Sequence, residues 1–294
     1  MTSVTVPGRA PQTTTRRSRR PLGVAVGVAD VRSEPDGASE LVTQALLGAS
    51  AVPLEEAANG WTRVRLVDYE GWARTDALAA PAHVTAMVAI VAATRAPLYA
   101  TARGADELGE VFATTSLPIT AAGQRPATGR TRVALPGGRV AWVAADVVVE
   151  RPSGEPFPLR GAEAGVALAR RLLGTPYLWG GVTAQGIDCS GLTQLACREG
   201  GRTIPRDAGQ QYEALNYIVE RADVRFGDLI YFASQGAITH VGIALDKMTL
   251  LHASGGGEGV VITSLDPADG EQSARRAGMY AGARRPFDAP GGQR

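Results

Sequence analysis

The pattern of hydrophobic and polar positions changes near residue 160. Before that point, short apolar–polar alternations are interrupted by Gly, Pro and Asn, which is typical of short β-strands joined by turns. The stretch VAVGVADVR (24–32) predicts the first of these strands. Beyond residue 160 the apolar spacing becomes helical and then alternates again. The pattern therefore predicts an all-β part followed by an α+β part.

The second part of the chain carries three helical patterns and then three strand patterns. GAEAGVALARRLLG (161–174) predicts an amphipathic helix closed by Gly174. A second helix is expected to begin at Cys189, and a polar third one is expected around 206–215. The expected strands are 227–233, 238–245 and 248–254.

The first part of the chain contains an internal repeat. GASEL (37–41) returns as GADEL (104–108), and WTRVRL (61–66) returns as RTRVAL (130–135). Trp72 likewise returns as Trp142, so the offset grows from 67 to 70 residues and allows a short insertion in the second copy. Repetition of short strands without a long helix predicts two small all-β barrels of about 60 residues each.

Composition shifts set the expected domain boundaries. ERPSGEPFP (150–158), rich in Pro, separates the repeats from the helical pattern. The expected units are a disordered tail at 1–21, barrels at 22–82 and 87–150, a linker at 151–160, and the α+β domain at 161–288.

Net charge and the N-terminal segment bear on which partners and which compartment are expected for this protein. A formal charge of +1, from 30 basic and 29 acidic residues, makes nucleic acid an unfavoured partner. Arg16–Arg20 resembles the charged start of a signal peptide, but the apolar stretch that follows is short, and nothing reaches membrane-spanning length. We therefore favour a cytoplasmic protein, with secretion to the cell wall as the alternative, and we expect a monomer.

Cys189 lies where an irregular loop becomes the first turn of a helix. Unpaired N–H groups and the helix dipole favour a thiolate there, so Cys189 is a candidate nucleophile. The alternative is a buried structural cysteine, which suits Cys197 deeper in the same helix. The two are eight residues apart, about 12 Å along a helix, which is too far for a disulfide.

Two of the three histidines fall on neighbouring predicted strands. A loop at 245–247 would place His240 directly opposite His252 on one face of a hairpin, while His83 lies in a connector. His240 could then take the thiol proton, and His252 could fix its tautomer and orientation. Two alternatives are half-buried structural histidines and a zinc site with both cysteines, whose C-x₇-C spacing matches no common zinc signature. No cofactor is expected.

Several stretches resemble one family of enzymes in composition and order. TPYLWGGVTAQGIDCSGLTQ, IPRDAGQQ, GDLIYF and THVGIAL…LLHAS are similar to motifs of the NlpC/p60 cysteine peptidases, papain-like enzymes that cut bacterial cell-wall peptides. The resemblance spans about residues 161 to 287. It implies Cys189 as nucleophile, His240 as base and His252 as the third member, with Tyr177 beside an oxyanion hole formed with the Cys189 N–H.

The repeats resemble bacterial SH3 (SH3b) domains over 22–82 and 87–150, through a Gly/Ala-Trp pair before the closing strand. Two such barrels before an NlpC/p60 domain are similar to the dipeptidyl-peptidases of muropeptide recycling. Those enzymes cleave after γ-D-glutamyl in L-Ala-γ-D-Glu-L-diamino acid peptides, and their first barrel caps the free amino end. The expected fold is therefore multidomain, with two SH3-like barrels and a papain-like α+β catalytic domain.

The same resemblance implies a set of substrate-binding residues. Glu34 and Tyr69 would hold the substrate ammonium group by charge-assisted hydrogen bonds. The remaining subsites would be lined by Trp179, Asp188, Ser190 and Asp207, while Ala208 stands where Ser is expected in this branch, which puts the preference for the diamino acid in doubt. Alternatives are an enzyme acting on intact peptidoglycan and a non-catalytic wall-binding protein, although a complete triad argues against the latter. Diaminopimelate and lysine are both open at the third substrate position.

Overall fold

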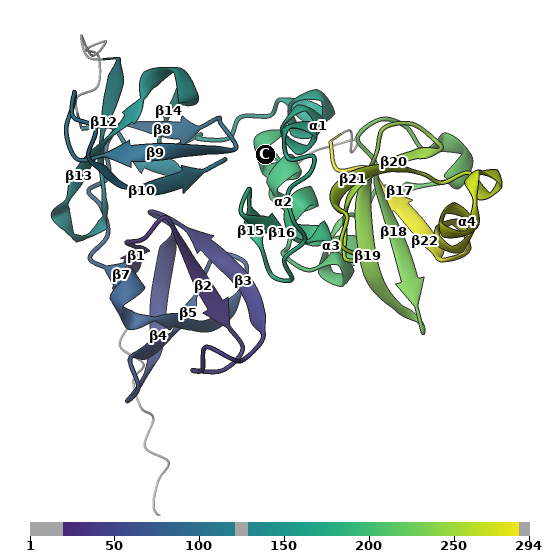
Figure 1. Ribbon diagram of the computed structural model, residues 1–294, viewed down its shortest axis with the longest axis horizontal. Coiled ribbons are helices and arrows are strands. Elements are labelled where there is room, and N and C mark those ends of the chain that lie inside the picture. Colours follow the sequence, from purple (N-terminus) through teal and green to yellow (C-terminus); the bar gives the residue numbers. More distant parts are fainter. Residues whose placement is uncertain (1–19, 121–128, 288–294) are drawn as a thin grey trace, which may run out of the picture.

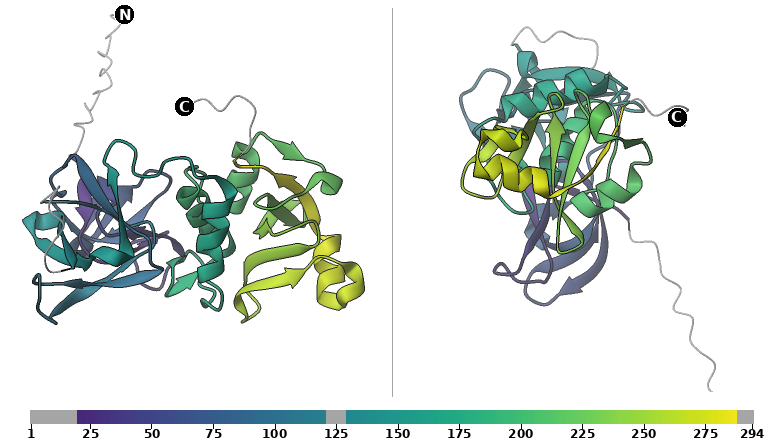
Figure 2. Two further views of the ribbon diagram at one scale, coloured as in Figure 1. Left: turned by 90° about the horizontal axis from the view of Figure 1, so that it is seen from above. Right: turned by 90° about the vertical axis from the view of Figure 1, so that its right-hand side faces the viewer.

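The computed structural model describes residues 20–120 and 129–287, in which two β domains lie on one side of a mixed α/β domain (Figure 1). Two further views show the helices α1–α3 between the β domains and the large C-terminal sheet (Figure 2). The expected tail at 1–21 falls almost wholly outside the described residues. Within the described ranges, no helix is long and apolar enough to span a membrane.

The first β domain is one seven-stranded sheet with the order β3-β2-β6-β5-β4-β1-β7. Its strands are β1 Leu22–Val24, β2 Val28–Arg32, β3 Leu41–Leu46, β4 Ser50–Ala57, β5 Trp61–Arg65, β6 Glu70–Arg74 and β7 Leu78–Ala79. Inward-facing small and β-branched residues, such as Val24, Val31 and Val64, form its core.

The single strand expected at 24–32 is two strands instead. The backbone turns between Val24 and Val28, so β1 pairs with β4 and β7 while β2 pairs with β3 and β6. Gly27 is required in this turn because a Cβ there would lie 2.3 Å from the carbonyl oxygen of Glu110 in the second β domain. A long-range backbone approach thus overrides the local alternation.

The second β domain repeats the strand order of the first in two smaller sheets, β10-β9-β13-β12 and β11-β8-β14. Its strands are β8 Met87–Val91, β9 Arg95–Tyr99, β10 Glu107–Phe112, β11 Ser116–Pro118, β12 Arg130–Ala134, β13 Val140–Ala144 and β14 Val148–Pro152. Among the described residues, one bridge between Ile119 and Val133 stands where the first domain has its β4–β5 ladder.

The α/β domain packs helices against a six-stranded sheet with the order β17-β22-β18-β19-β20-β21. Its helices are α1 Gly161–Arg171, α2 Cys189–Glu199, α3 Ala208–Ala214 and α4 Glu271–Gly278. Its strands are β15 Val182–Thr183, β16 Gly186–Ile187, β17 Ile218–Val219, β18 Leu229–Ser234, β19 Ala237–Ala244, β20 Thr249–Ser254, β21 Gly259–Ser264 and β22 Tyr280–Arg284. The expected helices and strands of this part are confirmed, with ends shifted by one to three residues.

Side chains of β18 show how the sheet is covered on both faces. Leu229 and Tyr231 belong to the core shared with α1 and α2, whereas Ile230 and Phe232 belong to a second core on the opposite face. A strand buried on both faces reads as a continuous apolar run, as DLIYFA does. The sheet is thereby fixed against α2, whose first residue is Cys189.

Candidate active site

Cys189 is the first residue of α2 and is only 6 % exposed. Asp188 caps the helix, because its carboxylate accepts hydrogen bonds from the N–H groups of Gly191 (2.7 Å) and Gly180 (2.8 Å). The thiol also receives backbone hydrogen bonds from Ser190 and from Val241, the neighbour of His240. The start of α2 and the middle of β19 therefore meet at the sulfur atom.

The resting state of this thiol differs from the sequence-based expectation. Burial raises the pKa of Cys189 to about 11, and the Asp188 carboxylate adds to that rise, while the two backbone donors and Arg206 oppose it only in part. Desolvation thus outweighs the helix dipole, which is worth about 1 kcal/mol at a helix end. Cys189 rests as a thiol, and the expected thiolate is wrong for the free enzyme.

His240 on β19 and His252 on β20 are joined by a hydrogen bond of 2.8 Å between Nε2 of His240 and Nδ1 of His252. The expected contact exists, but the expected register is wrong. Ile243 pairs with Leu251, and the Leu245 N–H bonds the Thr249 carbonyl, so the loop is 246–248 and the two histidines are diagonal neighbours. Diagonal positions on one face of a hairpin remain within reach of long side chains.

The hydrogen bonds continue to a residue that the sequence did not single out. Nε2 of His252 lies 3.2 Å from Oγ1 of Thr263 on β21, diagonally across from His252. If each imidazole donates outward along this chain, Nδ1 of His240 keeps its lone pair and can accept a proton. The Thr263 hydroxyl can accept the hydrogen bond at the end of this chain, which is compatible with that pair of tautomers.

Both imidazoles rest neutral at physiological pH. Burial and then the charge of Arg276 lower the pKa of His240 to about 4. Burial, His240 and Arg276 lower the pKa of His252 to about 3. The free site therefore holds a thiol and two uncharged imidazoles, so attack by this sulfur would have to be coupled to removal of its proton.

Tyr177 forms a parallel β-bridge with Ile187, which is two residues before Cys189. This bridge holds Tyr177 near the sulfur atom. Burial raises the pKa of its phenol, and the charges of Cys189 and Asp188 add to the rise. The hydroxyl therefore stays protonated and can donate a hydrogen bond, as an oxyanion stabiliser must.

Asp188 and Ser190 are buried beneath the site, where they bind a side chain that sequence reasoning missed. Arg206, itself 1 % exposed, binds the Asp188 carboxylate in a bidentate pair at 2.9 and 2.7 Å. It also donates to Oγ of Ser190 (2.8 Å) and to Oγ1 of Thr43 in the first β domain (3.0 Å). IPRDAGQQ contains Arg206, but only the tertiary packing shows its partners. Asp188 and Ser190 therefore support the site through internal hydrogen bonds.

The first β domain meets the α/β domain close to the predicted substrate residues. The Tyr69 hydroxyl donates to Asp207, the residue before α3, and burial raises the pKa of that carboxyl. The indole of Trp179 donates to Glu40 (2.8 Å) and is 59 % exposed. Gly180 is essential here, because its φ of 75° is left-handed and a Cβ would lie 2.3 Å from the Leu41 carbonyl oxygen.

Glu34 and Ala208 are placed differently from Tyr69 and Asp207. Glu34 lies on the exposed turn after β2, and within the described residues its carboxylate makes no hydrogen bond or ion pair. Glu40, six residues on, is the carboxylate that contacts Trp179 and adds to the rise in the pKa of Tyr69. Ala208 is the buried first residue of α3 and presents no hydroxyl. The repeated GASEL segment contained Glu40, but its repetition alone carried no sign of function.

Both cysteines are free, and Cys197 is buried within the helical core, where burial raises its pKa to about 12. Among the described residues, no group of three or more His, Cys, Asp or Glu side chains is arranged to hold a metal ion. The chemistry that this arrangement can perform is nucleophilic attack by a thiol, with an imidazole as the base.

A buried thiol at a helix start and a hydrogen-bonded histidine pair on the neighbouring sheet are the kinds of group that cysteine hydrolases use. A sequence model of the NlpC/P60 family matches residues 174–289, and one described as the bacterial dipeptidyl-peptidase Sh3 domain matches residues 31–78. The chain is 30 % identical over 254 residues to dipeptidyl-peptidase 6 of Lysinibacillus sphaericus, covering 81 % of this chain and 89 % of that protein. The protein belongs to the NlpC/P60 family of cysteine peptidases.

Two further comparisons agree with this assignment. A γ-D-glutamyl-L-lysine dipeptidyl-peptidase of Bacillus cereus is 33 % identical over 158 residues, which is 52 % of this chain but only 45 % of the length of that relative. The crystal structure of an NlpC/P60 family protein from Bacillus cereus superposes with a TM-score of 0.79, covering 92 % of this chain and 100 % of that one. At 24 % identity, this second likeness shows the fold alone. The match at 31–78 lies within the first β domain, and the assignment of residues 87–150 as a second SH3b barrel stays a prediction.

Proposed function

We propose that this peptidase hydrolyses the γ-D-glutamyl–L-diamino acid bond of peptidoglycan-derived peptides that begin with a free L-Ala. The observation that carries the proposal is the meeting of Glu40 and Tyr69 of the first β domain with Trp179 and Asp207 beside the start of α2. Two carboxylates and a phenol around one position suit an α-ammonium group. The printed names of the relatives, γ-D-glutamyl-L-lysine dipeptidyl-peptidase and dipeptidyl-peptidase 6, support the same class of substrate.

The reaction then follows from the resting protonation states. Nδ1 of His240 takes the Cys189 proton while the sulfur attacks the γ-carbonyl carbon of D-Glu, and the Cys189 N–H and Tyr177 hydroxyl receive the developing oxyanion. Collapse of the tetrahedral intermediate breaks the amide bond, and His240 passes its proton to the leaving amine. A water molecule, deprotonated by His240, next attacks the thioester. L-Ala-D-Glu leaves, and Cys189 returns to the thiol form.

The proposal is tested with two peptides, free L-Ala-γ-D-Glu-diaminopimelate and the same peptide N-acetylated, followed by mass spectrometry. Cys189→Ala enzyme serves as the blank. Release of L-Ala-D-Glu from the free peptide alone is the expected result. Cleavage of both peptides would remove the amine cap and favour intact peptidoglycan as substrate. Cleavage of neither would favour a non-catalytic wall-binding protein.

Two carboxylates compete for the role of amine ligand. Glu34 was predicted from sequence, whereas Glu40 contacts Trp179, so Glu40→Gln is expected to raise KM for the free peptide and Glu34→Gln is the matched control. A rise in KM for Glu34→Gln alone would return the role to Glu34.

A further inference from the structure

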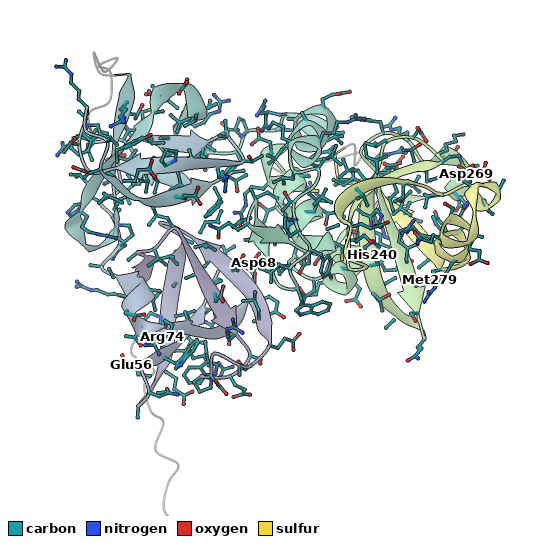
Figure 3. The ribbon with its side chains drawn as sticks, in the orientation of Figure 1. Glu56, Asp68, Arg74, His240, Asp269 and Met279 are labelled. Atoms are coloured by element: carbon teal, nitrogen blue, oxygen red, sulfur yellow. The ribbon has the colours of Figure 1, made fainter. Side chains whose placement is uncertain are left out.

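His240 and His252 also line a pocket of about 460 Å³ between the sheet and α4. One wall consists of His240, His252 and Phe232 from the sheet. The opposite wall belongs to α4 and the residue after it, with Gln272, Arg275, Arg276 and Met279, and the rim includes Ser254–Gly256 and Glu258. His240 and Met279 lie close together in the side-chain view (Figure 3). No residue of the two β domains lines this pocket.

The pocket is positively charged where it faces the base. Arg276 is half-buried, and within the described part of the chain its guanidinium makes no hydrogen bond or close ion pair. Its charge is near enough to both imidazoles to contribute to the lowering of their pKa values. Arg275 adds a second cation, and Glu258 at the rim supplies the one carboxylate. A guanidinium that has a carboxylate nearby but no hydrogen bond to it suits an anionic group on a ligand.

The chemistry of the proposed reaction decides which part of the substrate enters this pocket. The acyl half of the peptide, L-Ala-γ-D-Glu, is assigned to the side of Trp179 and Asp207. His240 must give its proton to the leaving nitrogen, so the leaving residue has to lie against His240 on the other side of the sulfur. The pocket between the histidines and α4 borders His240 and is lined by no residue of the first β domain.

We propose that this pocket is the subsite of the leaving diamino acid, in which Arg275 and Arg276 bind a carboxylate of that residue and Glu258 holds its free ammonium group. The inference rests on the proposed function and extends it to the third substrate residue. A carboxylate can come from the main-chain terminus of a tripeptide or from the side chain of diaminopimelate. A lysine residue offers Glu258 the same ammonium group, but its main-chain terminus is the only carboxylate that it offers the two arginines.

Binding and turnover are measured separately to test the subsite. Calorimetry with inert Cys189→Ala enzyme compares L-Ala-γ-D-Glu-diaminopimelate, the same peptide with only its side-chain carboxylate amidated, and L-Ala-γ-D-Glu-L-Lys as free acid and C-terminal amide. We expect amidation of the bound carboxylate to weaken binding roughly ten- to a hundredfold, as loss of a charge-assisted hydrogen bond does. The amide that shows the loss identifies which carboxylate is bound.

The variants Arg275→Gln and Arg276→Gln, each added to Cys189→Ala, should bring the acid-to-amide ratio of Kd toward one. Arg170→Gln is the matched control, because it removes the same charge from an exposed position on α1. A ratio that persists in both pocket variants, or that stays near one in the parent, would overturn the subsite. Failure of the parent enzyme to release L-Ala-D-Glu from any peptide would instead overturn the proposed function.

Discussion

The two β domains share a strand order but differ in what they contribute to the active site. The first domain bonds to the peptidase domain through Glu40, Thr43, Gln44, Asp68 and Tyr69. The second offers Glu110, which accepts from Gln185, and the Ala92 carbonyl, which accepts from Arg171. Asp68 points from the first domain toward the peptidase domain in Figure 3.

One turn accounts for part of this difference. The β5–β6 turn of the first domain is closed by Leu66 and Tyr69, and the matching β12–β13 turn of the second by Leu135 and Arg139. Between these ends the first turn carries Val67 and Asp68, whereas the second carries Pro136, Gly137 and Gly138. Side chains that can bind polar groups therefore exist at only one of the two turn tips. The two repeats thus share a backbone arrangement, while the contacts that each can make depend on the side chains at the tips of these matching turns.

The largest expected difference between the domains lies in stability. Arg206 bonds Thr43 of the first domain and is the counter-ion of Asp188. Arg206→Met leaves the Asp188 carboxylate buried and unpaired, so the free energy of unfolding should fall by about 3–5 kcal/mol. Arg95→Met in the second domain breaks an exposed pair with Glu110 and should cost at most about 1 kcal/mol. Denaturant unfolding followed by circular dichroism measures both. Equal losses would mean that the Arg206 pair is no more important than an exposed one.

The next largest difference between the two β domains should be in their effect on substrate affinity. Glu40 and Glu107 occupy matching positions in GASEL and GADEL, so Glu107→Gln is a control for Glu40→Gln within one protein. Loss of a charged hydrogen bond predicts a roughly ten- to a hundredfold higher KM for the free-amine peptide in Glu40→Gln, and no change in Glu107→Gln. Steady-state kinetics by mass spectrometry checks this. A similar KM for both variants and the parent would break the comparison.

The acid limb of the pH profile of kcat/KM should depend on the peptidase domain, and its alkaline limb on the first β domain. The charges that move the pKa of His240 are Arg276 and Asp188, both in the peptidase domain. His240 accepts a proton only when neutral, so kcat/KM should fall as pH drops through about 4 and stay high above it. The alkaline limb should instead follow loss of the substrate ammonium near a pKa of about 8.

That alkaline limb should weaken in Glu40→Gln, while the acid limb stays where it was. Initial rates at low substrate concentration, from pH 3.5 to 9.5, would separate the two. An acid limb near pH 6.5, the ordinary value for histidine, would contradict a buried neutral base.

The smallest effect is expected at the interface of the second domain. Gln185→Ala removes an exposed hydrogen bond to Glu110 and should change the free energy of unfolding by less than about 0.5 kcal/mol, with unaltered KM. Thermal melting and steady-state kinetics on one preparation measure both quantities. A KM that rises as much as in Glu40→Gln would give the second domain a direct part in substrate binding.

Sequence patterns predicted the secondary structure well where the signal was local. The helices at Gly161 and Cys189 and the three strands of the β18–β20 meander follow from periodicity and turn residues. The split at Gly27 was missed because it depends on a backbone approach from Glu110, more than 80 residues away. The loop between β19 and β20 lies one residue later than predicted, since a polar stretch such as LDKM can form a turn at either position.

The candidate nucleophile and base could be singled out because the chain offers only two cysteines and three histidines, and their roles stay predictions. Arg206, Thr263 and Glu40 belong to residue types that are common on surfaces, and only their partners distinguish them. The protonation state of Cys189 also eluded the sequence, because burial outweighed the helix start. The local sequence pattern therefore indicates where reactive groups lie, whereas the protonation state of those groups depends on how they are packed.

The raised pKa of Cys189 has a consequence for how the enzyme meets oxidants and inhibitors. Peroxides and alkylating reagents react with thiolates, so Cys189 is expected, as a buried thiol, to resist oxidation to sulfenic acid. Small unselective electrophiles should therefore label it slowly at neutral pH. A covalent inhibitor would have to occupy the substrate position first and bring its reactive carbon to the sulfur while His240 removes the proton.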